Sequence, residues 1–285
     1  MKLSSHQLFL SAFIGIALHA TAQKTKPVTL TARIIDKHLA KVSDTLYAYR
    51  YETCNGEYNL FLAAIKNSNP NLYNSCLVDS TNWPLRYCEP MVNYYHRHPV
   101  FARYPVVNVS YEAANEYCKW LTGLYNSDPK REFKKVEFRL PTETEWMRAA
   151  EGGRSQAMFP WGKFYLRNKN GQHMCNYNSV NEMAIYRDDL GRPMIAVDSS
   201  NHSRFAGSLN DRIYYTVNVG SYYPNDYGIY NMSGNAAEMT IEKGLTKGGS
   251  WDSYGSEVTI RSVKIYKGSS PELGFRVFMK VIEKQ

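Results

Sequence analysis

The chain has 285 residues, of which 44% are hydrophobic, 14% aromatic and 21% charged, and its formal net charge is +8. This composition excludes a disordered chain, because it supplies enough apolar surface for a sizeable core. The basic residues are scattered and no nucleic-acid-binding module is recognisable, so we expect no nucleic-acid partner. The 23 tyrosines favour a loop-rich fold with binding surfaces.

The first 22 residues have the features of a secretory signal. Lys2 supplies a positive charge, residues 8–18 form an apolar segment, and residues 20–22 (ATA) match a cleavage site. The apolar segment is shorter than the roughly 20 residues that a membrane span needs, and no cysteine follows the cleavage site. We therefore expect an exported protein without a lipid anchor or a transmembrane segment, periplasmic or associated with the outer membrane, with a single domain over residues 23–285.

Two segments near the N-terminus have recognisable periodicity. Residues 28–35 (VTLTARII) alternate between apolar and polar side chains, which predicts a β-strand. Residues 55–66 (NGEYNLFLAAIK) place apolar side chains at helical spacing, and Asn55 is a favourable N-cap. A strand followed by a helix is therefore expected before a long polar and aromatic loop.

Capping residues indicate two further helices. Residues 110–121 (SYEAANEYCKWL) begin with Ser110 as the N-cap and carry an apolar stripe, in which Cys118 is a core residue. In RLPTETEW, Thr142 and Glu145 form a capping box. The acidic residues of this motif are therefore better explained by helix capping than as a catalytic pair.

The chain contains five cysteines, and an exported protein permits disulfides. They are Cys54, Cys76, Cys88, Cys118 and Cys175. Cys76 and Cys88 flank a loop-like segment and are the most favourable pair, and the odd count leaves at least one thiol unpaired within the chain. Because no cysteine follows residue 175, the C-terminal third has no thiolate for a redox metal.

Six motifs occur in order along the chain. They are PVVNVSYEAANEYCKWL, RLPTETEW, FPWG, YGIYNMSGNAAEM, KGGSW and LGFRV. Together they resemble the formylglycine-generating enzyme, or sulfatase-modifying factor, superfamily. The resemblance implies an α+β domain with an irregular, C-type-lectin-like fold and little regular secondary structure.

One branch of this superfamily looks closer than the others. The segments EPMVNYYHRHPVFARYPVVNVS and FPWGKFYLRN, with the KGGSWDS and GFRV ending, are similar to the gliding-motility and type IX secretion lipoproteins. This resemblance implies a protein partner in the cell envelope. The chain departs from that branch because it is short and lacks the lipidated cysteine.

Sulfatase-activating members of the superfamily bind copper through two cysteines that follow the GGS-aromatic motif. The resemblance places Ser253 and Val258 at these two positions, and neither supplies the thiolate that copper(I) needs. Another branch holds iron with a histidine cluster on an added domain, whereas here only His96 and His98 form a close pair, which we expect to be structural. We therefore expect no copper, no iron and no catalytic residue of these types.

Calcium is the expected cofactor. The stretch NMSGNAAE offers hard oxygen donors, which calcium prefers, and the resemblance points to the same positions. This first site comprises the side chains of Asn231 and Glu238 and the carbonyls of Gly234 and Ala236. A second site, which only the resemblance implies, comprises Asn176, the Tyr177 carbonyl, Asp211 and the Ile213 carbonyl.

Three functions are compatible with these features. The first is a catalytically silent member that binds an envelope protein partner, and it accounts for the export signal, the scaffold motifs and the missing thiols. The second is a metal-dependent oxidoreductase with rearranged ligands. The third is a lectin-like ligand-binding module.

We favour the first function, with the polar stretch after KGGSW as a recognition surface. This ligand or partner surface comprises Trp251, Ser253, Tyr254, Ser256 and Tyr266, and the lectin-like alternative adds Thr259 and Ser262 to its ligand face. Four further residues are expected to have structural roles: Arg139, Thr142, Glu145 and Arg276. Arg276 is expected to be a buried arginine that organises the final strand.

Overall fold

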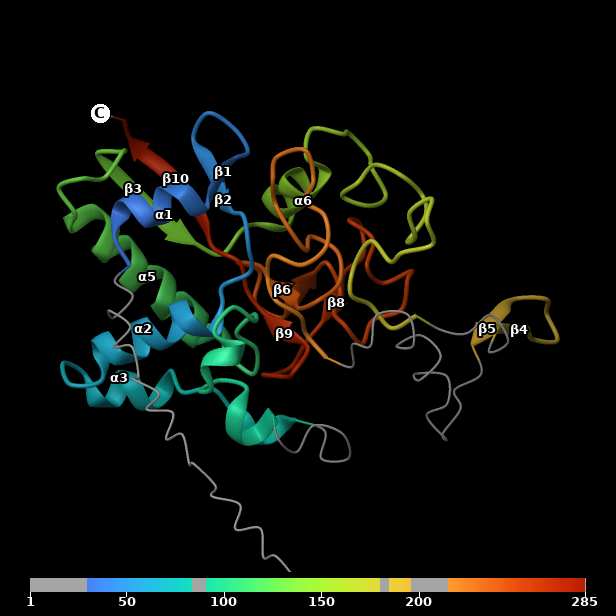
Figure 1. Ribbon diagram of the computed structural model, residues 1–285, viewed down its shortest axis with the longest axis horizontal. Helices are drawn as coiled ribbons and strands as arrows, with labels where there is room; N and C mark the ends of the chain where they lie inside the picture. Colours follow the sequence, from blue (N-terminus) through green and yellow to red (C-terminus); the bar gives the residue numbers. More distant parts are fainter. Residues whose placement is uncertain (1–29, 84–90, 180–184, 196–214, 285) are drawn as a thin grey trace, which may run out of the picture.

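A computed structural model of the chain describes residues 30–83, 91–179, 185–195 and 215–284 (Figure 1). The signal segment, Cys88, Asp211 and Ile213 lie outside the described residues, so the Cys76–Cys88 pairing stays a prediction. Within these ranges, no helix is both long enough and apolar enough to cross a membrane.

The largest sheet joins the two ends of the described chain. Its strands are β1 (Leu39–Lys41), β2 (Leu46–Tyr49), β10 (Phe278–Glu283) and β3 (Lys135–Arg139). They are antiparallel and lie in the order β1-β2-β10-β3. The last strand of the chain is therefore a central strand, and Phe278 is paired with Ala48 on one side and with Arg139 on the other.

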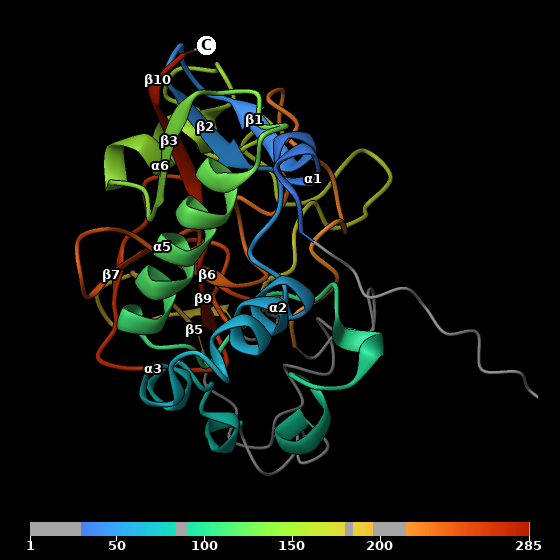
Figure 2. The same cartoon turned by 90° about the vertical axis from the view of Figure 1, so that its left-hand side faces the viewer.

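Helices cover both faces of this sheet (Figures 1 and 2). Helices α1 (Ala32–His38) and α5 (Tyr111–Ser127) lie on one face, and α6 (Glu143–Glu151) lies on the other. Helix α2 (Asn55–Ile65) packs against α5 and against α3 (Pro70–Ser75), and the chain also has short turns η1 (Ser80–Asn82) and η2 (Pro99–Phe101). Successive side chains of a strand point to opposite faces. Met279 and Val281 accordingly join the large aromatic core of α2 and α5, whereas Phe278 packs in a second cluster with Trp146 of α6.

A second sheet carries the loops of the C-terminal part. Its strands are β8 (Lys264–Ile265), β7 (Leu245–Lys247), β6 (Ala237–Met239) and β9 (Leu273–Gly274), in that order, with β6 and β9 parallel. A separate hairpin consists of β4 (Ile185–Arg187) and β5 (Pro193–Ile195). Short elements and long loops make this an α+β fold with little regular secondary structure, as expected.

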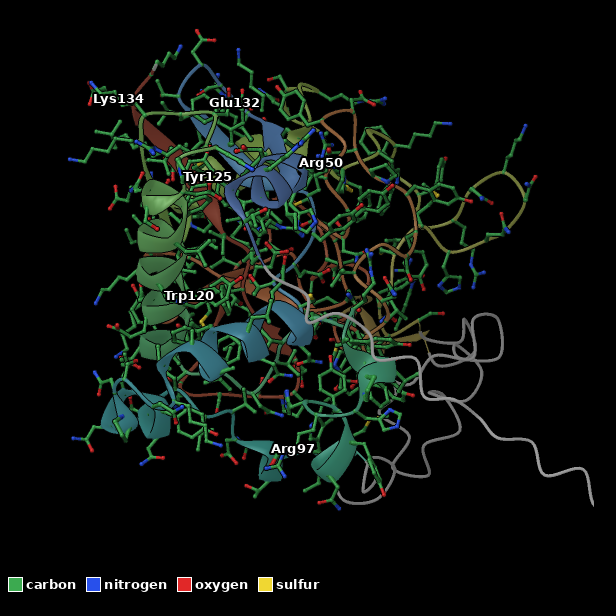
Figure 3. The ribbon with its side chains drawn as sticks, turned by 60° about the vertical axis from the view of Figure 1, so that its left-hand side comes forward. Arg50, Arg97, Trp120, Tyr125, Glu132 and Lys134 are labelled. Carbon is green, nitrogen blue, oxygen red and sulfur yellow. The ribbon has the colours of Figure 1, made fainter. Side chains whose placement is uncertain are left out.

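The strand predicted for residues 28–35 is wrong within the described residues. The chain forms helix α1 from Ala32 onward, and both Ala32 and Ile35 are buried at helical spacing. The Asp128 carboxylate accepts a hydrogen bond from the Ala32 N–H. Tyr125 of α5 also donates to Asp36 (Figure 3). Contacts with distant residues therefore override the local alternation of side chains.

The predicted helices are present, with one difference at their caps. Ser110 accepts a hydrogen bond from the Ala113 N–H at the start of α5, which continues to Ser127. Helix α2 begins at Asn55, but Cys54 is its N-cap, and the Asn55 side chain instead donates to the carbonyls of Tyr95 and Phe101. The amide therefore ties the helix to the following loop.

Candidate functional site

The GGSW motif forms a tight loop directly after β7. Gly248 and Gly249 have positive φ angles of 83° and 64°. A Cβ atom at Gly249 would lie 2.8 Å from the carbonyl oxygen of Glu257, so glycine is required for this close approach. The Ser253 hydroxyl accepts a hydrogen bond from the Ser250 N–H (3.0 Å), which closes the loop.

Apolar side chains surround Val258, one of the two positions to which the resemblance assigns a copper-binding cysteine. Val258 is fully buried and packs with Phe159, Cys175, Trp161, Leu166 and Tyr177. A Cβ at Gly255 would lie 2.5 Å from Leu166 Cδ1, and the rings of Phe159 and Trp161 are stacked at 5.0 Å. The FPWG segment therefore packs over the loop that follows GGSW, and Val258 is surrounded by apolar side chains.

No cysteine lies close to Val258 in the sequence, but one lies close to it in the folded structure. Cys175 belongs to the same buried cluster as Val258. The two residues are distant in the chain, so no local pattern in the sequence predicts this proximity. One buried cysteine beside a valine and a serine is still not the pair of thiolates that the copper site uses.

The residues of the predicted recognition surface differ in their burial and in their hydrogen bonds. Ser253 is buried, which corrects its assignment to an exposed face, because its hydroxyl is used within the loop. Ser256, Thr259 and Ser262 form a compact turn: Ser262 donates to the Ser256 carbonyl (2.8 Å), and the Thr259 and Ser262 hydroxyls are 2.6 Å apart. Tyr266 packs instead against the core of α5.

The two aromatic residues of this loop are half-buried. The indole N–H of Trp251 donates to the Pro271 carbonyl (3.1 Å). The Tyr254 N–H donates to the Glu257 carboxylate (2.7 Å). Together with the exposed Ser256 and the half-buried Thr259 and Ser262, they keep solvent contact in this loop.

Arg276 is the centre of a buried polar network. Its guanidinium is 0% exposed and pairs with Glu238, itself 1% exposed, at 2.6–3.1 Å. It also donates to the carbonyls of Tyr49 and Tyr230. The buried arginine thus links β2, β6 and the final strand segment, as the sequence suggested.

A second buried carboxylate, which the sequence analysis missed, lies in the same network. Glu52 accepts hydrogen bonds from the side-chain amides of Asn231 (2.9 Å) and Asn235 (2.8 Å) and from the Ala236 N–H (3.3 Å). Burial raises the pKa of Glu52 to about 8, against the attraction of Arg276. Burial therefore favours the protonated form of Glu52, and the local signal in the sequence is a single acidic residue between Tyr51 and Thr53.

The first predicted calcium site fits a cation only in part. The Asn231 side-chain oxygen is buried without a hydrogen-bond partner, as a metal ligand would be. The Glu238 carboxylate, however, accepts hydrogen bonds from Arg276 on both oxygens and from the Trp146 indole N–H (2.7 Å). Its acceptor positions are filled and its charge is neutralised, so Glu238 as arranged does not fit a calcium ion.

Half of the second predicted calcium site can be placed. The Asn176 amide donates to the Tyr215 carbonyl and to the Asn235 side chain, and the Asn176 carbonyl accepts from the Asn235 N–H (2.8 Å). A Cβ at Gly234 would lie 2.0 Å from that carbonyl oxygen. The two predicted calcium loops are thus in direct contact, while the other half of the second site lies outside the described residues.

The two histidines of the close pair are not part of one site. His96 is buried, its Nδ1 lies 3.1 Å from the Asn55 side-chain oxygen, and burial lowers its pKa to about 4. His98 is on the surface and accepts a hydrogen bond from the Val100 N–H. Among the described residues, no three histidine, cysteine, aspartate or glutamate side chains converge as a metal site would require.

Comparison with known proteins assigns the family. The Sulfatase-modifying factor enzyme 1-like domain matches residues 36–281, most of the chain. The chain belongs to this family. A formylglycine-generating enzyme of Thermomonospora curvata is 30% identical over 139 residues, 49% of this chain and 33% of that protein. The inactive C-alpha-formylglycine-generating enzyme 2 of Bos taurus is 26% identical over 189 residues, 61% of this chain and 49% of that protein.

The chain therefore spans half or less of these relatives. Among solved structures, PvdO from Pseudomonas aeruginosa aligns with a TM-score of 0.55 at 18% identity, covering 82% of this chain and 80% of that one. This likeness shows a shared fold, and it agrees with the α+β architecture described above.

Proposed function

We propose that this sulfatase-modifying-factor-like protein is a non-catalytic binding or scaffold component of the cell envelope. One observation carries the proposal: Ser253 and Val258, the positions to which the resemblance assigns the copper-binding cysteines, are a buried hydroxyl and a valine in a packed apolar cluster. Copper(I) sites of this type require a pair of soft thiolate ligands, and this packed apolar cluster contains a single cysteine, Cys175. The match to an inactive formylglycine-generating enzyme 2 is consistent with a non-catalytic role.

The proposed partner is a protein of the gliding-motility or type IX secretion apparatus. The N-terminal signal features and the resemblance of three segments to lipoproteins of that apparatus support this proposal. The surface available for recognition includes Trp251, Tyr254 and Ser256, which the rigid GGSW loop presents.

A cross-linking pull-down tests this partner. Purified tagged protein is cross-linked to envelope fractions, and the captured proteins are compared with those captured by a Tyr254→Ser variant. We expect envelope proteins to be enriched with the native chain and depleted with the variant. Recovery of none above background would remove the partner claim while leaving the family assignment intact.

The alternative function is a metal-dependent oxidoreductase with rearranged ligands. The proximity of Cys175 to Val258 is the observation in its favour. Metal analysis of the purified protein, with oxygen consumption on thiol-containing peptides, decides between the two. Our proposal predicts substoichiometric copper and iron and no oxygen uptake, and stoichiometric metal that disappears in Cys175→Ser would establish the alternative.

A further inference from the structure

A second surface lies in the segment that closes over the GGSW loop. Between Gly152 and Asn181 the chain contains no aspartate or glutamate but four basic residues. They are Arg154, Lys163, Arg167 and Lys169. The segment (yellow-green in Figure 1) lies on the opposite side of the picture from α5 and α2. It is therefore a locally cationic stretch, distinct from the main core.

The tip of this segment exposes two adjacent aromatic rings. Phe164 and Tyr165 are each 74% exposed, and Lys163 and Lys169 beside them are also exposed. Arg154 is different, because its guanidinium is paired with Asp226 at 2.6 Å. The tip thus combines apolar rings with nearby ammonium groups that have no carboxylate partner among the described residues.

The backbone holds these rings away from the core. The Trp161 indole N–H donates to the Tyr165 carbonyl (2.9 Å), and the Gly162 N–H donates to the Phe159 carbonyl (2.9 Å). Leu166, the next residue, is packed in the Val258 cluster. Because both ends of the tip are fixed, folding does not bury Phe164 and Tyr165, and their exposure is built into the loop.

We propose that the loop 161–169 docks on an anionic lipid surface, with Phe164 and Tyr165 inserted at the headgroup level and Lys163 and Lys169 on lipid phosphates. Aromatic side chains favour the membrane interface, because their rings are apolar and remain compatible with polar headgroups. Flanking lysines are attracted to anionic lipids, and the absence of carboxylates in the segment removes the opposing repulsion. This inference goes beyond the proposed function and does not depend on a protein partner.

Vesicle co-sedimentation with the purified chain tests the proposal. The probes are vesicles of phosphatidylcholine alone and of phosphatidylcholine with an equal part of phosphatidylglycerol. We expect binding to the anionic vesicles only, weakened by salt. The double variant Phe164→Ser/Tyr165→Ser should lower the partition coefficient at least about tenfold, because it removes the two rings that insert into the membrane interface. Lys163→Gln/Lys169→Gln should lower it severalfold.

A matched control comes from β8 and the residue before it. Val263 and Ile265 are also exposed apolar side chains, on a different element, so Val263→Ser/Ile265→Ser should leave vesicle binding unchanged. Circular dichroism establishes that every variant is folded. Absence of binding, equal binding to neutral vesicles, or equal loss in the control would overturn the proposal. Capture of an envelope protein through Phe164 and Tyr165, without lipid binding, would also overturn it.

Discussion

Replacement of Glu52 by glutamine tests whether the buried network holds a proton. Glu52 accepts three hydrogen bonds from Asn231, Asn235 and the Ala236 backbone, and its pKa is raised from 4.5 to about 8. A carboxyl group with a raised folded-state pKa binds its proton more tightly in the folded than in the unfolded chain. Its contribution to stability is therefore complete below about pH 4.5 and is lost as the pH rises through about 8.

The size of this effect follows from the difference between the two pKa values. One unit of pKa shift corresponds to about 1.4 kcal/mol. The native chain should therefore lose up to about 1.4 kcal/mol of unfolding free energy per pH unit between about pH 4.5 and 8, on the order of 5 kcal/mol in total. Glutamine keeps the shape and the neutral charge of the protonated side chain, and its oxygen can still accept a hydrogen bond from the Asn235 amide or the Ala236 N–H.

Urea unfolding followed by tryptophan fluorescence, across this pH range, measures the difference. We expect the stability of Glu52→Gln to depend less on pH and to exceed that of the native chain above about pH 8. The control is Glu137→Gln, because Glu137 is an exposed carboxylate on β3. Parallel stability curves for the native chain and Glu52→Gln would refute the reasoning.

Three further predictions concern the remaining parts of the network and the scaffold. Arg276→Met should lower the free energy of unfolding, measured in urea, by about 3–5 kcal/mol, because it leaves the Glu238 carboxylate buried without its cationic partner. The double variant Arg276→Met/Glu238→Gln should recover part of this loss. Thr142→Ala should cost about 1 kcal/mol, because it removes the N-cap of α6, and an unchanged unfolding midpoint would contradict this. Calcium bound at the second predicted site should raise the melting temperature and a chelator should lower it. Asn176→Ala should abolish the increment, whereas Glu238→Gln should retain it, and a melting curve unchanged by exhaustive chelation would refute the second site.

Local chemistry was sufficient to predict the starts of α5 and α6. The Thr142 hydroxyl accepts the Glu145 N–H, and the Glu145 carboxylate accepts the Thr142 N–H, as the four-residue motif indicates. Arg139 adds two hydrogen bonds of 2.7 Å to the same carboxylate. These contacts lie within seven consecutive residues, so the sequence contains all the information needed to place them.

The features that sequence reasoning missed depend on contacts between distant segments. Helix α1 is fixed by Asp128, and Cys175 meets Val258 only after the loops have packed. Glu52 and Glu238 face the same arginine, although no motif joins them. Ser253 is buried because its hydroxyl serves its own turn, an outcome that its polarity alone does not indicate.

The position of β10 has a consequence for how the molecule is made. Strands β2 and β3 lie on either side of β10, so they are joined into one sheet only through residues 278–283, which follow both strands in the chain. Until residues 278–283 have been added, the inner edges of β2 and β3 have no strand to pair with. The two core clusters also lack the strand that contributes side chains to both of them. This sheet can therefore be completed only after residues 278–283 have been synthesised, and its pairing with β2 depends on contacts between segments far apart in the sequence.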